Sequence, residues 1–386
     1  MPDRLARLSA EVRAAAGGRR RLAPRGAGRW WTGRTEGATV LECAADAGQL
    51  RVEAGDLVAT AGAGCRLGDL DRRLRDERVW LALDPPGPAD RTLGGALASG
   101  GAGPLAALFG PPRDQTLGLS VIGGNGTLAR TGGRVVKNVA GFDLAKALIG
   151  AHGGFGILVE AHLRLRAVPE ADATRAWTGA LPDVTEAAAR VLGAGALPGA
   201  FEVLSPELAA AVVGGGAESW TLLVRALGTA AGVREELEAA GAAVSGTRVD
   251  VLPPPGDPWR RWPEAVGALP VILRIGAEPS AWQHAVSFAA RHLGAAAVGG
   301  AGRVSVTVPR GTVRVALAAA EPGALVRLRL ECATRGWPLT LERADPALLS
   351  AVGVWGALTP TAERLTRALR ATFDPHGVFA VPLLAA

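Results

Sequence analysis

The chain has 386 residues, of which 48% are hydrophobic and 20% are charged. This length predicts two or three domains, and the composition is that of a globular protein with a large core, which excludes a disordered chain. The formal charge of +6 comes from scattered arginines without interleaved aromatic residues, so we expect no nucleic-acid partner. The three cysteines are far apart and form no C-x-x-C motif, which excludes a disulfide framework and a cysteine metal site and favours a reducing cytoplasm.

The first 170 residues predict short strands and helices separated by glycine turns. The opening segment is charged and helical, unlike a signal peptide, and no apolar run approaches the ~18 residues of a membrane span, so we expect membrane association only through a partner. The patterns predict helices over 4–16, 67–76 and 143–149, a short helix after Thr92, strands over 21–24, 38–43, 57–62, 79–83 and 157–168, and a hairpin of strands 117–122 and 127–131. Asp143 is interpreted as a helix N-cap rather than a catalytic acid.

Residues 171–350 differ in texture, because alanine-rich helices alternate with short strands. We expect helices over 186–193, 230–240, 280–293 and 323–335, and strands over 222–225, 271–275 and 304–308. This alternation predicts a small antiparallel sheet with helices on one face. Residues 253–263 contain five prolines without periodicity and predict a loop, and a last helix and turn are expected to pack back on the first domain.

Three glycine-rich segments predict backbone contact with one large anionic ligand. Arg25-Gly-Ala-Gly-Arg29 combines a glycine turn with two charges, Thr92-Leu-Gly-Gly95 begins a helix whose N-terminal amides can take an anion, and Gly153-Gly-Phe-Gly156 precedes a strand. The first segment lacks the third glycine of a dinucleotide-binding Rossmann fingerprint and leads into tryptophans rather than a helix. We therefore exclude a nicotinamide site there.

The rarest residue types point to one region of the chain. Lysine, asparagine, isoleucine, phenylalanine and tyrosine occur 16 times in total, and nine of these residues fall within 122–157. Arginine, alanine and glycine have replaced them elsewhere, so we expect the chemistry or its scaffold in this region.

The order of motifs identifies a resemblance. The runs RGAG, DPP, TLGGALASGGAGP, FGPPRD and GGRVVKNVAGFDLAKALIGAHGGFGILVEAHLRL closely resemble the FAD-binding E subunits of bacterial glycolate oxidases. These subunits are part of the flavin oxidase superfamily typified by vanillyl-alcohol oxidase and para-cresol methylhydroxylase (PCMH). The most specific run is KNVAGFDL, which begins at Lys137, and the tail FDPHGVF is also similar.

The resemblance implies an α+β fold with three parts. These are a PCMH-type FAD-binding domain over residues 1–170, with lobes of about 1–65 and 66–170, an α+β cap over 171–352, and a C-terminal helix and tail over 353–386 that return to the FAD domain. It also implies FAD as the cofactor. Some relatives carry a histidine bonded to flavin after the first glycine turn, where this chain has Arg29 and Trp30, so we expect non-covalent FAD.

The resemblance also implies which residues lie along the cofactor, in chain order. They are Arg25, Gly26, Ala27, Gly28 and Arg29 at the pyrophosphate; Pro85, Thr92, Gly94, Gly95 and Ser99 along the pyrophosphate and ring; Arg113 and Asp114 near the flavin or its phosphates; Lys137, Asn138 and Gly141 near the flavin or the lobe interface; and Gly156 and Ile157 by the ribityl and adenosine parts. For Lys137 and Asn138 a loop brace is the equal alternative. No residue is assigned to catalysis or to a metal, because the five histidines form no H-x-x-H-x-H arrangement.

Three functions stay open. The first is an FAD-binding subunit of a 2-hydroxyacid (glycolate) oxidase complex that works with a catalytic flavin subunit and an iron–sulfur subunit. The second is a self-sufficient FAD oxidoreductase, and the third is a non-catalytic FAD-binding scaffold. The family usually has two arginines and a tyrosine where this chain has Leu105, Ala106, Ala107, Leu108 and Phe109, which puts the substrate or partner face in question more than FAD binding.

Overall fold

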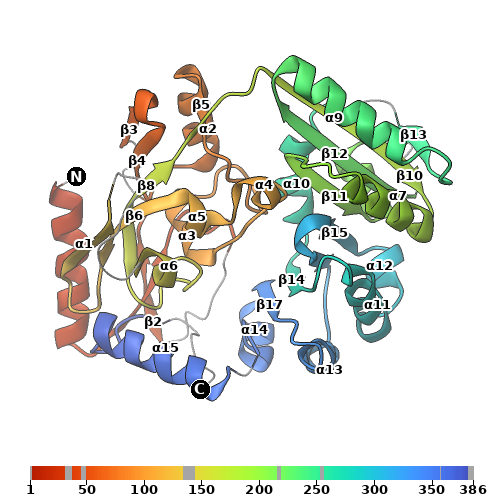
Figure 1. The fold of residues 1–386 in the computed structure, drawn as a ribbon. Helices are drawn as coiled ribbons and strands as arrows, with labels where there is room; N and C mark the ends of the chain where they lie inside the picture. The colour runs from red at the N-terminus through yellow and green to blue at the C-terminus, as the bar shows by residue number, and fades with distance from the viewer. Residues whose placement is uncertain are drawn as a thin grey trace.

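The computed structural model describes residues 2–30, 37–44, 49–133, 144–214, 219–252, 256–356 and 358–380. Lys137, Asn138, Gly141 and Asp143, which the sequence analysis singled out, lie outside the described residues. Figure 1 shows two halves side by side, with the N-terminal strands in one and the strands after residue 170 in the other.

The N-terminal half contains two sheets and a short strand pair. A parallel pair joins β1 (Arg21–Arg25) to β2 (Ala38–Glu42), and an antiparallel pair joins β5 (Val79–Trp80) to β9 (Arg166–Ala167). The five-stranded antiparallel sheet has the order β3-β4-β8-β6-β7, with bounds Leu50–Glu53, Val58–Gly62, Ile157–Arg164, Thr116–Ile122 and Leu128–Gly132. The helices are α1 (Pro2–Gly17), η1 (Ala54–Asp56), α2 (Leu67–Asp76), α3 (Leu93–Ser99), α4 (Ala106–Phe109), α5 (Pro112–Gln115) and α6 (Leu144–Leu148).

The sheet of this half does not divide near residue 65, where we expected one lobe to end. Strand β4 pairs with β8 along its whole length, so strands from before and after that residue share one sheet. The reason is burial, because β4 and β8 carry alternating small and branched side chains that need a common core. The hairpin of β6 and β7 and the helix α2 form as the sequence predicts, whereas the strand expected over 79–83 is limited to β5.

The second half is built on one eight-stranded antiparallel sheet. Its strand order is β13-β10-β12-β11-β15-β16-β14-β17, with bounds Asp250–Leu252, Ala171–Gly179, Trp220–Gly228, Ala200–Leu204, Arg303–Thr307, Thr312–Leu317, Val271–Gly276 and Leu339–Arg343. The helices are α7 (Leu181–Gly193), α8 (Pro206–Val212), α9 (Ala230–Ala243), α10 (Pro258–Val266), α11 (Trp282–Leu293), α12 (Ala296–Gly299), η2 (Val308–Arg310), α13 (Pro322–Ala333) and α14 (Pro346–Val352).

Helices cover both faces of this sheet, which corrects the prediction of one covered face. Apolar side chains of α7, α9, α11 and α13 pack on one face in a single large core. Those of α8 and α10 pack on the other face, against alternate residues of the same strands. For example, Leu222 belongs to the first core and Leu223 to the second, as the two-residue period of a strand requires.

The loop expected over residues 253–263 is also corrected, because α10 occupies its second part. Pro258 stands in the first turn of α10, where its missing N–H costs no hydrogen bond, and the Asp257 side chain accepts a hydrogen bond from Arg260 N at 3.1 Å. Pro263 lies inside the helix. Trp259 and Trp262 are buried, so tertiary packing stabilises a helix that proline content argues against.

The C-terminal segment runs back along the N-terminal half. Helix α15 (Pro360–Phe373) lies beneath this half in Figure 1. After it, Leu22 N donates to Val378 O at 2.7 Å and Ala380 N donates to Leu22 O at 2.8 Å, while Phe379 is fully buried in the N-terminal core. In the described part of the chain, no helix has the length and apolar character that a bilayer crossing needs.

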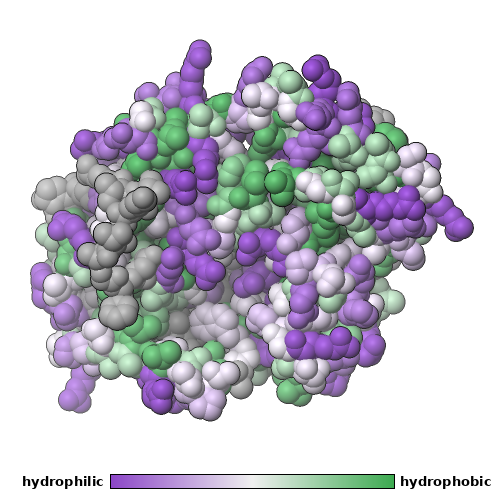
Figure 2. Space-filling view, viewed as in Figure 1, coloured by the Kyte–Doolittle hydropathy of each residue, from purple (hydrophilic) through white to green (hydrophobic). Residues whose placement is uncertain are grey.

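Helix α4 is formed by the leucine- and alanine-rich segment that departs from the family pattern. It lies between the two halves (Figure 1). Leu105 is buried with Trp80, and the ring of Phe109 meets the Trp80 ring edge-on at 5.5 Å, whereas Leu108 is 45% exposed. Figure 2 shows hydrophobic side chains gathered over this region of the surface, between more hydrophilic areas. Apolar packing between the halves therefore explains why much of this segment consists of apolar residues.

Candidate functional site

A groove in the N-terminal half brings the three glycine segments together. Its lining includes Arg25 and Gly26 from the first segment, Thr92, Gly94 and Gly95 from the second, and Gly153, Gly156 and Ile157 from the third. Ala63, Ala98 and Cys43 complete much of the wall. Small side chains and bare backbone therefore line a continuous surface, although the segments are up to 132 residues apart in sequence.

The turn after β1 supplies donors for an anion. Gly26, Ala27 and Gly28 donate no backbone N–H to any other described residue. Gly28 has φ +65°, a conformation that favours glycine, and a Cβ at residue 26 would lie 2.3 Å from Thr92 Oγ1. Only glycine at position 26 lets this turn pack on the start of α3, and amides without a partner among the described residues fit a phosphate group.

The start of α3 differs from the expectation that its amides take an anion. Leu93 N donates to Cys65 O at 2.8 Å, Gly94 N donates to Ala63 O at 2.7 Å, and Gly95 N donates to Thr92 Oγ1 at 3.2 Å. These first amides of the helix already have protein partners, so they are not anion donors. The segment contributes close approach instead of charge.

Both arginines of the first segment have carboxylate partners. Arg25 Nε lies 3.0 Å from Glu42 Oε1, which raises the pKa of Arg25, and Arg29 Nε lies 2.6 Å from Asp90 Oδ2. Arg25 lines the groove, whereas Ala27, Gly28 and Arg29 are not among its lining residues. Cys43 also lines it, and burial raises the pKa of this thiol to about 11, so the groove wall is neutral there.

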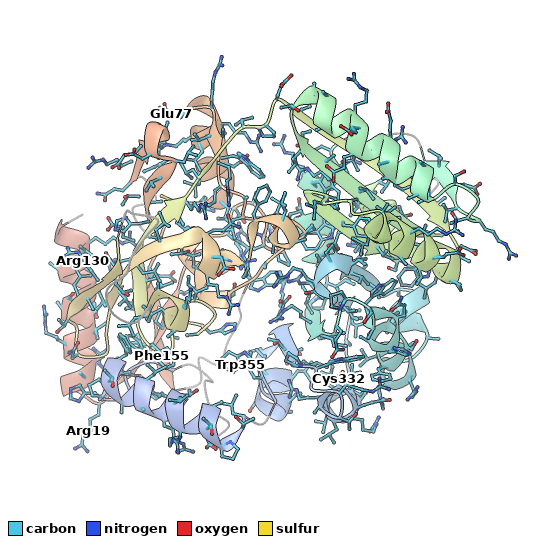
Figure 3. All side chains as sticks on the ribbon, in the orientation of Figure 1. Arg19, Glu77, Arg130, Phe155, Cys332 and Trp355 are labelled. Atoms are coloured by element: carbon cyan, nitrogen blue, oxygen red, sulfur yellow. The ribbon has the colours of Figure 1, made fainter. Side chains whose placement is uncertain are left out.

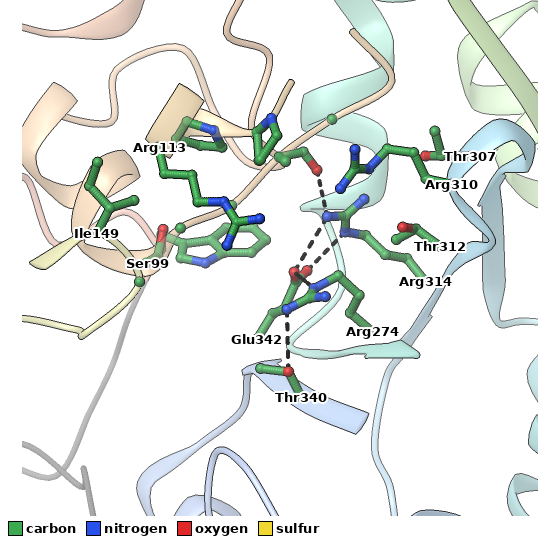
Figure 4. A pocket seen from close by; sticks show the side chains of 18 of the residues that line it. Ser99, Arg113, Ile149, Arg274, Thr307, Arg310, Thr312, Arg314, Thr340 and Glu342 are labelled. Carbon is green, nitrogen blue, oxygen red and sulfur yellow. Dashed lines mark hydrogen bonds and ion pairs between the residues drawn. The ribbon is translucent and has the colours of Figure 1, made fainter. Parts of the chain in front are cut away.

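A second cavity, of about 290 Å³, opens between the two halves (Figure 4). The N-terminal half contributes Ser99, Arg113 and the glycine-rich segment 100–103. The sheet of the second half contributes Arg274 and Arg314, with Glu342 between them, and η2 contributes Arg310. Pro85 and Asp114 line neither cavity, so of the predicted residues that the structure describes, Ser99 and Arg113 are the two that lie here.

His152 connects the two cavities, since it lines both. It has φ +51°, which is uncommon for a residue with a side chain, and its ring meets Trp355 at 5.3 Å, close to edge-on. Figure 3 shows Trp355 between the two halves. Burial lowers the pKa of His152 to about 4, so this imidazole is neutral at pH 7. His152 is a candidate functional residue that the sequence patterns did not indicate, although it directly precedes the third glycine segment.

The polar face of the second sheet explains why the arginines point to this cavity. Along β14 and β16, residues alternate between the apolar core and the opposite face, and Arg274 stands directly opposite Arg314 in the strand pair. Thr340 is the partner of Arg274 on β17, and Ser305 is the partner of Arg314 on β15. The sequence signal was a single arginine within each of two otherwise apolar strands, which the sequence analysis did not use.

The carboxylate of Glu342 compensates the two positive charges of Arg274 and Arg314, which face each other across the strands. Arg314 Nε lies 2.9 Å and Arg274 Nε lies 2.8 Å from its two carboxylate oxygens. Burial opposes ionisation of Glu342, but the charges of Arg314 and Arg274 and their hydrogen bonds outweigh it, so its pKa is below the ordinary value. Arg314 also donates to Ala102 O at 2.5 Å, which ties the sheet to the N-terminal half.

Comparisons with known proteins agree with this geometry. Residues 1–132 match the family model described as an FAD binding domain. The N-terminal half contains an FAD-binding domain. Solved structures with a similar fold include alkyldihydroxyacetonephosphate synthase, with a TM-score of 0.67 and 16% identity over 96% of this chain and 74% of that one. Another is a chitooligosaccharide oxidase, with a TM-score of 0.65 and 17% identity over 99% and 90% of the two chains. The α+β fold of this chain is thus shared with both of these proteins.

Curated relatives match this chain over part of its length. Glycolate oxidase subunit GlcD of Bacillus subtilis is 33% identical over 156 residues, which are 40% of this chain and 33% of the relative. Glycolate oxidase subunit GlcE of Escherichia coli is 34% identical over 140 residues, 36% of this chain and 40% of the relative. A mitochondrial D-lactate dehydrogenase (cytochrome) of Arabidopsis thaliana is 35% identical over 31% of this chain and 21% of the relative. The matches therefore span less than half of each relative, and FAD is the cofactor that they support.

Gly95 borders open space in the groove. A Cβ at Gly95 would lie 3.1 Å from Thr92 Oγ1 and near no other protein atom, so it would project into the groove of the FAD-binding domain. We expect Gly95→Val to lower the FAD content of the purified protein at least tenfold, measured as the ratio of flavin to protein absorbance. The reason is that two γ-methyl groups would occupy the cofactor's volume.

Gly232→Val is a closely matched control for this change. Gly232 N donates to Thr229 Oγ1 at 3.2 Å at the start of α9, and a Cβ there would lie 3.2 Å from that oxygen, so the local helix geometry is the same. Gly232 is exposed, and it is not among the residues that line the groove. Equal flavin content in both variants would show that Gly95 does not border the cofactor.

Proposed function

We propose that the chain is an FAD-dependent oxidoreductase that oxidises a small 2-hydroxy acid. The observation that carries this proposal is the connection, at His152, of the glycine-lined groove to a cavity with four arginines. A carboxylate substrate needs a cationic anchor beside the cofactor, and guanidinium groups bind carboxylates in a fixed two-point geometry. The names of the relatives, glycolate oxidase subunits and D-lactate dehydrogenase, support a substrate of this class.

In this proposal the groove binds the cofactor and the arginine cavity binds the substrate. The backbone amide of Gly26 and the charge of Arg25, which line the groove, would hold the pyrophosphate of FAD, and the small residues around Gly95 and Gly156 would admit its extended body. We propose that the cofactor is held non-covalently. Bound FAD supplies an acceptor for two electrons from the substrate C–H bond. The arginine cavity would orient the substrate carboxylate, and the neutral imidazole of His152, at the junction, would accept a hydrogen bond from its hydroxyl.

We further propose that the chain works as a subunit of a glycolate oxidase-like complex in the cytoplasm, where a catalytic flavin subunit and an iron–sulfur subunit complete the electron path. The three cysteines of the chain, Cys43, Cys65 and Cys332, are free thiols, and two of them are buried. An iron–sulfur cluster needs several cysteine thiolates together, so onward transfer through clusters requires a partner. Attachment to the inner membrane face would also come through that complex.

Anaerobic reduction tests the function. We expect the purified chain to carry bound flavin, and we expect glycolate, D-lactate or another 2-hydroxy acid to bleach its visible absorption when air is excluded. Protein that is colourless and cannot be reconstituted with FAD would contradict the proposal. Flavin that stays oxidised with every 2-hydroxy acid, both alone and with the partner subunits, would refute the substrate class.

The same experiment separates the subunit from a self-sufficient enzyme. Bleaching by the isolated chain at the rate of steady turnover would favour the self-sufficient alternative, whereas bleaching only in the presence of the partner subunits favours the complex. Retention of FAD with no reduction in either case would favour the non-catalytic scaffold.

A further inference from the structure

The cavity between the two halves contains more positive charge than one carboxylate can neutralise. Four guanidinium groups line it, and Glu342 is its only carboxylate among the described lining residues. Glu342 is shared between Arg274 and Arg314 and holds both at hydrogen-bonding distance. These two arginines and this glutamate form a closed unit with one positive charge in excess, on the cap side of the cavity.

The other two arginines come from opposite halves. Arg310 is at the end of η2 in the cap, and Arg113 is in α5 of the FAD-binding domain (Figure 4). Arg310 donates to Ala106 O at 3.3 Å, and in the described part of the chain no carboxylate lies within ion-pair distance of it. Arg113 Nε lies 3.7 Å from Asp114 Oδ1, but both side chains of this pair are about half exposed. Asp114 is not among the residues that line the cavity.

The pKa of Arg310 is lowered both by burial and by repulsion from the other arginines of the cavity. Burial lowers its pKa, and the nearby charges of Arg113, Arg274 and Arg314 lower it further, with Asp114 alone opposing them. Like charges gathered in a partly buried cavity destabilise the protein unless an anion joins them. A substrate carboxylate that pairs with one guanidinium would leave the second side of the cavity uncompensated.

We propose that the cavity binds a small dianion, so that the substrate is a 2-hydroxy acid with a second acidic group, either a carboxylate or a phosphate. This rests on the proposed function for the oxidation, whereas the binding itself does not. One acidic group pairs with the cap arginines Arg314 and Arg310, and the other pairs with Arg113 on the opposite side of the cavity. The excess positive charge selects a dianion over glycolate or lactate.

Calorimetric titration of the FAD-loaded protein tests the binding without turnover. Malonate serves as the dicarboxylate, 2-phosphoglycolate as the carboxylate with a phosphate, which adds up to about two charges at neutral pH, and acetate as the monoanion; none carries an oxidisable hydroxyl group. We expect at least one of the two ligands with a second acidic group to bind 10-fold or more tightly than acetate, and the tighter of the two identifies the preferred second group. Acetate binding as tightly as both dianions, or no dianion binding because the cofactor occupies the arginines, would overturn the proposal.

Two variants assign the binding to this cavity. Arg310→Met should weaken the preferred dianion 10-fold or more and change acetate affinity by less than threefold, and Arg113→Met, at a side chain that is 60% exposed, gives a second test if the first variant does not fold. Arg367→Met removes an exposed arginine of α15 that pairs with Glu363 and is the control, with unchanged affinity for all three ligands. Equal losses for acetate and the dianion would show that these arginines do not read the second charge.

Flavin reduction then separates this inference from the proposed function. We expect tartronate, malate or 2-hydroxyglutarate, or a phosphorylated 2-hydroxy acid, to exceed glycolate in kcat/KM by 10-fold or more. If glycolate is oxidised as efficiently as all of these, the dianion inference fails while the oxidoreductase stands. If no hydroxy acid reduces the flavin but malonate binds tightly, the oxidation fails while the dianion site stands.

Discussion

Replacing Glu342 with glutamine is expected to lower the free energy of unfolding by about 3–5 kcal/mol, because removal of one partner leaves buried charges uncompensated. The carboxylate is the only compensation for Arg274 and Arg314 that the described residues provide, and the side chain of Arg314 is only 3% exposed. These two arginines face each other directly across antiparallel strands, a pairing that is unfavourable without a counter-charge. Chemical denaturation at neutral pH measures the loss.

The control for this prediction is Glu363→Gln, which removes an exposed ion pair of α15 with Arg367 and should change stability by no more than about 1 kcal/mol. Malonate should partly restore the stability of Glu342→Gln, since an added anion can replace the lost carboxylate. The pH dependence has a definite sign. The folded-state pKa of Glu342 is depressed, so its contribution is present at neutral pH and is lost as the pH falls below the ordinary glutamate range. A loss no larger than that of Glu363→Gln would contradict the compensating role.

The second large expected effect is on the stability of a Glu202 variant, and its pH dependence is opposite to that of Glu342. This residue of β11 is fully buried at the base of the cap, and its carboxylate accepts a hydrogen bond from Ser305. Burial raises its pKa to about 7, the hydroxyls of Ser305 and Thr307 and the charge of Arg314 oppose the rise, and Asp84 adds to it. Asp84, in the FAD-binding domain, is likewise raised to about 7 by burial, with Leu105 N, Arg225 and Arg314 opposing. Two buried carboxyl groups thus interact across the contact between the halves.

The folded protein holds protons at these sites that the unfolded chain releases at the ordinary pKa. Stability from Glu202 is therefore complete below about pH 4 and is lost as the pH rises towards its folded pKa of about 7, by about 3 kcal/mol in all. Glu202→Gln cannot ionise, so we expect it to match the parent near pH 4 and to exceed it at pH 8. Denaturation curves across this range measure the difference. A constant difference between parent and variant at every pH would contradict the assignment, and Glu363→Gln again provides an exposed control.

Local sequence patterns predicted much of the first half correctly. The leucine spacing of α2, the turn of the β6–β7 hairpin and the strand β8 follow from short-range periodicity, which acts within one element. The helix α10 could not be predicted this way, because its stability comes from Trp259 and Trp262 packing under the sheet. Proline content is a local signal, and in this segment a tertiary contact outweighs it.

The amino-acid sequence by itself determined the glycine segments and hence the groove, since only residues without a Cβ permit the close approach of the turn at Gly26 to Thr92. It did not determine which amides stay free, because the partners of the α3 amides, Ala63 and Cys65, come from another part of the chain. The arginine cavity was decided by the tertiary structure alone. Arg274 and Arg314 become neighbours through strand register, and Arg113 and Arg310 face one cavity only because two halves with different cores meet. The sequence shows which residues are charged, but strand pairing and domain packing decide which surface or cavity each charge faces.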